Sequence, residues 1–331
     1  MRGLAALLGV AVLAGTSSSG SSSSPQGTQF RARTDVVMVP VSVMKGREPA
    51  PGLTVADFEL TDNGVRQVLD SASPETVGID VTMVLTEFPP DRDREFLRAV
   101  VSADTTRNLF QSTDRLRIVT VDSTVTGRLV GPDYNLAADP AVRALQGGVG
   151  FPGGFKVGPD PQRNGNGGVA LADALFYALA WPVGADRRHV VIAFTDGWDT
   201  ASALEMDALP RVAGRSDAVL HAVLWSTPQE GGTGGGIWTS APTPSSRRMW
   251  EQSYRALDQT VQRTGGTLQR TRNAAEALTE VISDFRSSYV LRYTPREVPT
   301  PGWHELKVSL KRPGGFSVRA RKGYEGGPSP K

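Results

Sequence analysis

Residues 190–199 read V-V-I-A-F-T-D-G-W-D, an apolar run that ends in two carboxylates separated by Gly and Trp. A second apolar run, Ile79–Leu85, ends in T-E-F-P-P-D at residues 86–91. Apolar runs of this length, without alternation, are typical of parallel strands that are buried on both faces. Ligands of parallel sheets bind at the carboxyl ends of the strands. Both stretches therefore lie where a binding site is expected.

Short apolar strands and amphipathic helices alternate from Ile79 to about Arg286. This alternation predicts an α/β fold with a doubly wound, mostly parallel sheet covered on both faces. Strands are predicted at 79–85, 114–122, 124–130, 189–194 and 218–225, and helices at 93–110, 138–146, 170–181, 201–212, 247–264 and 274–286.

Alternating β patterns flank this middle part on both sides. Val37, Val39, Val41 and Val43 fall on one face of a strand, and Pro40 favours an edge position or a bulge because it cannot donate to a ladder. D-N-G at residues 62–64 predicts a hairpin turn. After the middle part, strands are predicted at 288–294, 304–311 and 316–321. The two flanks together would form one small β-sandwich, and two separate β modules are the alternative.

The amino terminus has the pattern of an export signal. A short basic start, Met1-Arg2, precedes an apolar run at residues 3–15, which a Ser-rich tract follows. The sequence predicts an exported protein, periplasmic or extracellular, with no membrane segment beyond the signal peptide. The predicted divisions are 1–28 for signal and linker, 29–76 for the N-terminal β segment, 77–286 for the α/β domain, 287–325 for the C-terminal β segment and 326–331 for the tail.

Composition argues against several function classes. The net charge is only +2, and Lys and Arg are scattered rather than clustered, which argues against nucleic-acid binding. There are no cysteines, so disulfides, thiolate zinc sites and cysteine nucleophiles are excluded. The sequence contains neither a G-x-S-x-G elbow nor a P-loop, which favours a protein that is not an enzyme. His189, His221 and His304 have no ligand-like spacing and are predicted to be strand residues.

Several segments, in this order, resemble the von Willebrand factor A domain, and more closely the bacterial VWFA-related domain proteins. The resemblance covers roughly residues 29–325 and implies a von Willebrand factor A-like α/β fold. The segments are P-G-L-T-V-A-D-F-E-L-T-D-N-G (51–64), G-G-V-A-L-A-D-A-L (167–175), T-D-G-W-D (195–199), S-Y-V-L-R-Y-T-P (288–295) and V-R-A-R-K-G-Y (318–324).

The resemblance also implies where a metal-ion-dependent adhesion site would lie, and most of its ligands are replaced. In the family the site has Asp-x-Ser-x-Ser after the first strand, a Thr from a middle loop and an Asp after the fourth strand. The last of these matches Asp196, whereas the middle-loop Thr falls on Val169. The Asp-x-Ser-x-Ser positions fall on Thr86, Phe88 and Pro90. Mg²⁺ requires about six oxygen ligands, so the resemblance predicts a degenerate site and no cofactor.

A one-residue shift of register offers an alternative. Glu87 and Asp91 would then join Asp196 as three carboxylates, enough for Mg²⁺ or Ca²⁺. Pro89 and Pro90 argue against it, because they hold the segment in an extended path. In the simpler interpretation Glu87 is solvated and Asp91 caps the following helix. Asp199 is likewise expected to cap or start the helix that follows it.

These observations predict an exported, non-enzymatic protein-binding or adhesion module that works without metal. Its binding rim would include Phe88, Trp198, Asp199 and Trp238, with aromatic side chains that either anchor a protein partner or pack inward. One alternative is a structural component of an envelope assembly that accepts a partner strand at a sheet edge, residues 36–43. The other is a metal-dependent adhesin built on Glu87, Asp91 and Asp196.

Overall fold

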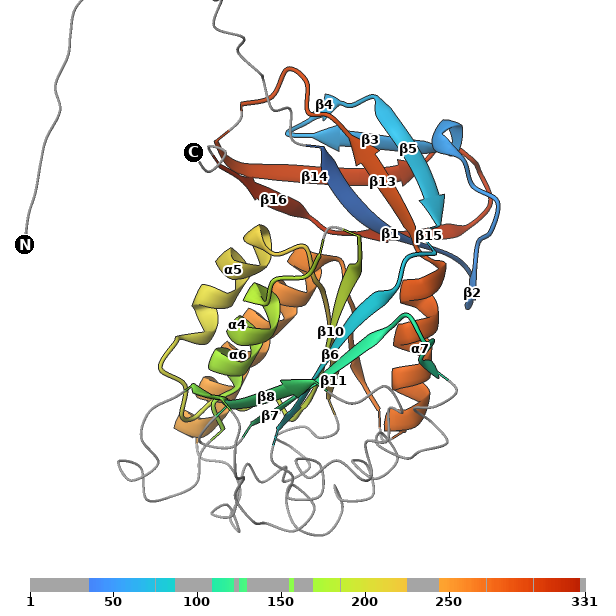
Figure 1. Cartoon of the computed structure of the whole chain (residues 1–331). Helices are drawn as coiled ribbons and strands as arrows, with labels where there is room; N and C mark the ends of the chain where they lie inside the picture. The colour runs from blue at the N-terminus through green and yellow to red at the C-terminus, as the bar shows by residue number, and fades with distance from the viewer. Residues whose placement is uncertain are drawn as a thin grey trace, which may run out of the picture. The chain divides into compact units, whose positions relative to one another are not determined.

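The computed structural model describes most of the chain after residue 35 (Figure 1). The predicted signal peptide and linker, residues 1–28, lie outside the described residues. Among the described residues, none of the helices combines the length and the apolar character that spanning a membrane requires. The described residues are 36–74, 76–86, 109–121, 125–129, 155–157, 169–184, 186–224, 244–271, 273–299 and 301–327.

A seven-stranded sheet forms the α/β part, with the strand order β12-β11-β10-β6-β7-β8-β9. The strands from β12 to β7 pair in parallel, and β8 and β9 add an antiparallel edge. Every residue of β6 and β10 is buried, which is why both strands are mostly apolar and do not alternate. The bounds are β6 (Ile79–Thr86), β7 (Arg115–Val121), β8 (Val125–Leu129), β9 (Phe155–Val157), β10 (Arg188–Thr195), β11 (Val219–Leu224) and β12 (Leu268–Arg270).

Helices cover both faces of this sheet, with α4, α5 and α6 on one side and α7 on the other (Figure 1). Each face has its own core, because successive strand residues point to opposite faces. Met83 and Leu85 of β6 lie in the core with α7, whereas Val84 lies in the core with α4 and α6. The helices are α4 (Leu171–Ala180), η4 (Met206–Ala208), α5 (Leu209–Arg215), α6 (Pro244–Thr264) and α7 (Ala274–Ser287).

The two β flanks interleave to form a small sandwich with a core of its own. One sheet has the order β15-β1-β13-β5, with β2 paired to β1, and the other has the order β16-β14-β3-β4. Each sheet therefore contains strands from both ends of the chain. The elements are β1 (Val37–Lys45), β2 (Glu48–Pro49), η1 (Val55–Asp57), β3 (Phe58–Asp62), β4 (Val65–Arg66), β5 (Leu69–Pro74), β13 (Tyr289–Tyr293), β14 (Gly302–Leu310), β15 (Phe316–Ala320) and β16 (Gly323–Gly326).

The predicted fold class is confirmed: a doubly wound, mostly parallel α/β sheet with flanking β segments that form a sandwich. The hairpin turn is also where the sequence predicts it, since Asn63 and Gly64 have positive φ values of 48° and 82° between β3 and β4. The three histidines lie in strands β10, β11 and β14. The short strand β16 was not predicted, and the helix predicted at 201–212 begins only at Leu209, after a 3₁₀ turn.

The prediction that residues 36–43 form an exposed edge is confirmed on one side of the strand for Val37–Pro40 and was wrong from Val41 onward. Strand β1 lies inside its sheet, with Val37–Val41 paired to β13 and Val41–Lys45 paired to β15. Proline has no backbone N–H to donate to a second neighbouring strand. Pro40 is tolerated because β1 pairs only with β13 at this position, and β15 joins from Val41 onward. The edges of this sheet are β15 and β5 instead.

A buried carboxylate links the two sheets of the sandwich. Asp62, at the end of β3, is fully buried and accepts hydrogen bonds from the hydroxyls of Tyr293 (2.8 Å) and Tyr324 (3.1 Å). Its other oxygen lies 2.9 Å from Nδ1 of His304, whose ring stacks on Tyr324. Burial raises the pKa of both tyrosines above the ordinary value, so their hydroxyls remain donors. The four side chains come from β3, β13, β14 and β16, and therefore from both ends of the chain.

We expect Asp62→Ala to be among the most destabilising substitutions in the sandwich. It removes the shared acceptor and leaves buried donors without a partner, which costs about 3 kcal/mol or more in the free energy of unfolding. Urea denaturation of the full chain measures this change. Glu305→Ala is the control, because that carboxylate side chain is 60% exposed and its ion pair with Lys307 lies at the surface, so its removal should change the free energy by less than about 0.5 kcal/mol. Equal effects of the two substitutions would contradict the role of Asp62.

Candidate functional site

The carboxyl ends of β6 and β10 form the switch point of the sheet, where the chain leaves neighbouring strands in opposite directions. The register pairs Leu85 with Phe194, so Thr86 and Thr195 are the next residues on each strand. Asp196 follows directly. The structure thus brings together two of the positions that the resemblance assigns to a metal site, Thr86 and Asp196.

Asp196 is held by bonds within its own turn. The side chain is 3% exposed, and Oδ1 accepts a hydrogen bond from the backbone N–H of Trp198 at 3.0 Å. Its backbone carbonyl accepts from the indole Nε1 of Trp250 at 2.9 Å. Gly197 adopts a φ of 83°, which favours glycine, and its N–H donates to the hydroxyl of Thr195. The turn is therefore held both by its own hydrogen bonds and by the bond from Trp250.

Thr86 and Val169 are also committed to the protein interior. Thr86 is fully buried, and its hydroxyl donates to the carbonyl of Phe194 at 3.4 Å. Val169 is buried and holds the turn after β10 through its backbone: its carbonyl accepts from the N–H groups of Thr200 and Ala201, and its own N–H donates to the Thr200 hydroxyl. The residue at the position expected for a threonine ligand thus holds residues 200–201 through its backbone hydrogen bonds.

Two aspartates lock the turn and the start of α4 onto each other. Both oxygens of Asp173 in α4 accept hydrogen bonds at 2.9 Å, from the backbone N–H groups of Ala203 and Leu204. Asp199 in turn accepts from the N–H of Ala172 and from the Ser202 hydroxyl. Burial raises the pKa of Asp199, against the opposing effect of these hydrogen bonds. The exchange of bonds fixes residues 199–204 to the first turn of α4.

These contacts correct the expectation for Asp199 and decide between the two alternatives for Trp198. Asp199 caps α4, which precedes it in the chain, rather than the following helix. Trp198 is 7% exposed, so it packs inward and is no exposed anchor for a partner. It sits next to Gly197 in a turn that is bonded to Trp250 and to Val169.

Other predicted site residues lie outside the described part of the chain, namely Glu87, Phe88, Pro90, Asp91 and Trp238. The three-carboxylate alternative therefore stays a prediction. Within the described residues, no group of three or more His, Cys, Asp or Glu side chains is placed to hold a metal ion.

Trp250 is a site residue that sequence reasoning missed. It is buried near the amino end of α6, stacks on Tyr254 at 5.0 Å between ring centroids and donates to Asp196. The spacing of the two aromatic residues, four positions apart, puts them on one helix face. That signal indicates a buried face, but not which turn of the sheet the face meets.

We expect Asp173→Ala to release residues 199–204 from α4. The loss of two hydrogen bonds to a buried carboxylate should lower the free energy of unfolding by about 2–3 kcal/mol. Hydrogen exchange should accelerate at the amides of Ala203 and Leu204, while the core amides of β6 keep their relative protection. Asp207→Ala, at an exposed carboxylate in η4, is the control. Unchanged exchange at both amides would show that the carboxylate does not hold the turn.

Comparison with known proteins adds similarity at the level of the fold. No family model matches the chain, and no curated protein matches it. A solved structure of the conserved hypothetical protein BatB from Bacteroides thetaiotaomicron is 14% identical, with 63% of this chain and 98% of that chain covered at a TM-score of 0.42. A von Willebrand factor type A protein from Catenulispora acidiphila is 11% identical, with 83% and 75% covered at a TM-score of 0.35. The SpRpn10 VWA domain is 9% identical, with 61% and 95% covered, also at 0.35. Similarity this distant carries no information about function.

Proposed function

We propose that this protein is an exported, non-enzymatic protein-binding module of the von Willebrand factor A type, which works without a metal ion at its switch point. The export signal is the sequence pattern of residues 1–28. The binding edge is the one at which β6, β10 and β11 end, because ligands of parallel sheets bind there.

Metal independence is supported by how the side chains of the switch point are used. Of the oxygens a metal would need there, the Thr86 hydroxyl is bonded to Phe194, and Val169 offers none from its side chain. One oxygen of Asp196 accepts from the backbone of Trp198. A hard cation needs about six oxygens, and a single carboxylate binds it weakly. This commitment of Thr86, Val169 and Asp196 to internal contacts is the observation that carries the proposal.

Protein binding is supported by the connections that leave this edge. Residues 225–243 join β11 to α6, and residues from Glu87 onward leave β6. Long connections at the ligand-binding edge of a rigid sheet are where binding residues concentrate. With Trp198 buried, Phe88 and Trp238 are the aromatic candidates of the rim, and Asp199 is the partly buried carboxylate beside it.

The metal question is tested by thermal melting of the full chain in EDTA and then in millimolar Mg²⁺, Mn²⁺ or Ca²⁺. We expect the same melting temperature in each condition. A cation that bound only the folded state at a hundredfold excess over Kd would add about 2.7 kcal/mol, a shift of several degrees.

A cation-dependent shift that Asp196→Ala abolishes and Asp217→Ala retains would overturn metal independence. It would favour the adhesin built on Glu87, Asp91 and Asp196 instead. Because the side chain of Asp217 is 89% exposed, it serves as a matched control for the loss of one carboxylate.

The rim is tested with the double substitution Phe88→Ala and Trp238→Ala. We expect at least about a tenfold loss in the amount of each specifically captured protein from an envelope extract, because aromatic anchors contribute most of the free energy of an interface. Phe176→Ala on α4, a phenylalanine that is 40% exposed, is the control and should capture as the unchanged protein does. Normal capture by the double variant would place the interface elsewhere.

A further inference from the structure

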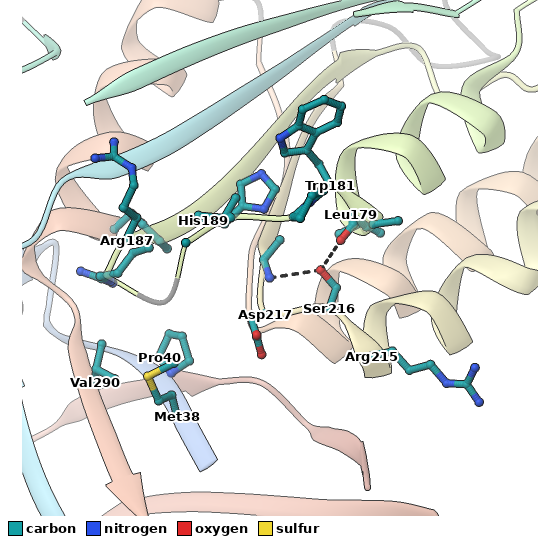
Figure 2. Close-up of a pocket in the computed structure, with 17 residues that line it drawn as sticks. Met38, Pro40, Leu179, Trp181, Arg187, His189, Arg215, Ser216, Asp217 and Val290 are labelled. Atoms are coloured by element: carbon teal, nitrogen blue, oxygen red, sulfur yellow. Dashed lines mark hydrogen bonds between the residues drawn. The ribbon is translucent and has the colours of Figure 1, made fainter. Parts of the chain in front are cut away.

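A cavity of about 350 Å³ lies at the opposite end of the sheet from the switch point (Figure 2). Its walls come from the amino end of β10, from the segment that follows α4, from the segment after α5, and from β1 and β13 of the sandwich. Its volume is in the lower part of the range of ligand pockets, about 300–1,000 Å³. The cavity therefore fits a small molecule rather than a chain segment.

The two sides of the cavity differ in chemistry. The sandwich contributes the apolar side chains of Met38, Pro40 and Val290, which lie near one another in Figure 2. The α/β part contributes every polar side chain of the lining, His189 included, together with apolar side chains such as Leu179 and Phe285. A ligand between them would have an apolar body on the sandwich side and a polar group on the sheet side.

The charge around the cavity is positive. Its described lining contains Arg187, Arg188 and Arg215 but one carboxylate, Asp217, whose side chain is mostly exposed. Asp80, behind the lining, is bonded to Arg187. The guanidinium of the buried Arg117 lies 3.9 Å from the centroid of the Trp181 ring, on which it stacks. This surplus of positive charge favours an anionic ligand group.

A chain of hydrogen bonds determines what His189 presents to the cavity. Thr82 Oγ1 accepts from Arg117 Nη1 at 3.3 Å and lies 3.0 Å from His189 Nε2. Arginine can only donate, so Thr82 Oγ1 accepts from Arg117 and keeps its own proton available for Nε2. When the hydroxyl donates this proton to Nε2, the proton of the neutral ring is on Nδ1, where it can be donated to a ligand.

The ring is neutral at ordinary pH. Burial first, and then repulsion from Arg117, lower the pKa of His189 to about 4. The residue is 6% exposed, and Nδ1 has no hydrogen-bond partner among the described residues. An N–H donor without a protein acceptor is available to an acceptor that enters the cavity.

We propose that this cavity binds a small amphipathic carboxylate, with the carboxylate accepting from His189 Nδ1–H within the positive lining and the apolar body against Met38, Pro40 and Val290. Thr82 and Arg117 act as positioning residues, since they set the tautomer of His189 without touching the ligand. The site is independent of the switch point and of the protein-binding function proposed for it.

The tautomer is measured directly by ¹⁵N–¹H correlation of the imidazole nitrogens in the full chain, in which three histidines make assignment practical. We expect a protonated Nδ1 and an unprotonated Nε2 at His189 near pH 7. A proton on Nε2 would overturn the relay through Thr82.

Binding is measured by calorimetry with phenylacetate as the probe. Phenylacetamide serves as the neutral control of equal shape, and inorganic phosphate as the anion without an apolar body. We expect phenylacetate to bind at least about tenfold more tightly than either, and to shift the Nδ1 resonance of His189. Absence of binding, or equal affinity for phenylacetamide or phosphate, would overturn the proposal.

Thr82→Val and Thr82→Ser separate positioning from packing. The valine keeps the shape but removes the hydroxyl, so it should allow the second tautomer and weaken phenylacetate binding about tenfold. The serine should restore both the tautomer and the affinity. Urea denaturation of both variants establishes that each is folded. Unchanged affinity in folded Thr82→Val would contradict the role of Thr82, and failure of the serine to restore binding would do the same.

Discussion

The pairing of β5 with β13 is the contact on which the rest of the molecule depends. It places Pro74, just before the α/β part begins, opposite Tyr289, just after that part ends. The sandwich therefore closes on strands that are more than two hundred positions apart, and ordering such a contact costs loop-closure entropy. The α/β part offsets this cost when it folds, because its first strand and last helix bring the two flanks together. Asp62, with partners from three other strands, then fixes the two sheets to each other.

The sequence predicts the central strands well because burial on both faces leaves little choice of residue. The run 79–85 is one residue shorter than β6 at its carboxyl end, and the run 189–194 is one residue shorter than β10 at each end. The hairpin at Asn63-Gly64 is predicted for a local reason, since few other residues adopt its backbone angles. In both cases the local structure is determined by a few residues that are neighbours in the sequence.

Features decided by distant partners could not be predicted in this way. The pattern of β1 shows a proline in a strand, but the staggered pairing of β13 and β15 decides that the strand has one neighbour up to Pro40 and a neighbour on the other side from Val41 onward. The start of α5 is delayed because residues 199–204 bond to α4 instead of forming a helical turn. The same bonds decide the role of Asp199. At the candidate metal site, the sequence indicates which oxygens are missing, whereas the structure adds that the Thr86 hydroxyl is bonded internally.

The junction of α7 and β13 has a mechanical consequence. Only Ser288 separates the helix from the strand, and Arg188 bonds that serine. One turn earlier, Asp284 is bonded to Ser42 in β1 and to Arg319 in β15. A shift of α7 along its axis would have to break these bonds and drag β13 past β1, which would move every side chain of the strand relative to its partner. The bonds of Ser288 and Asp284 therefore prevent α7 from sliding along its axis relative to the sandwich.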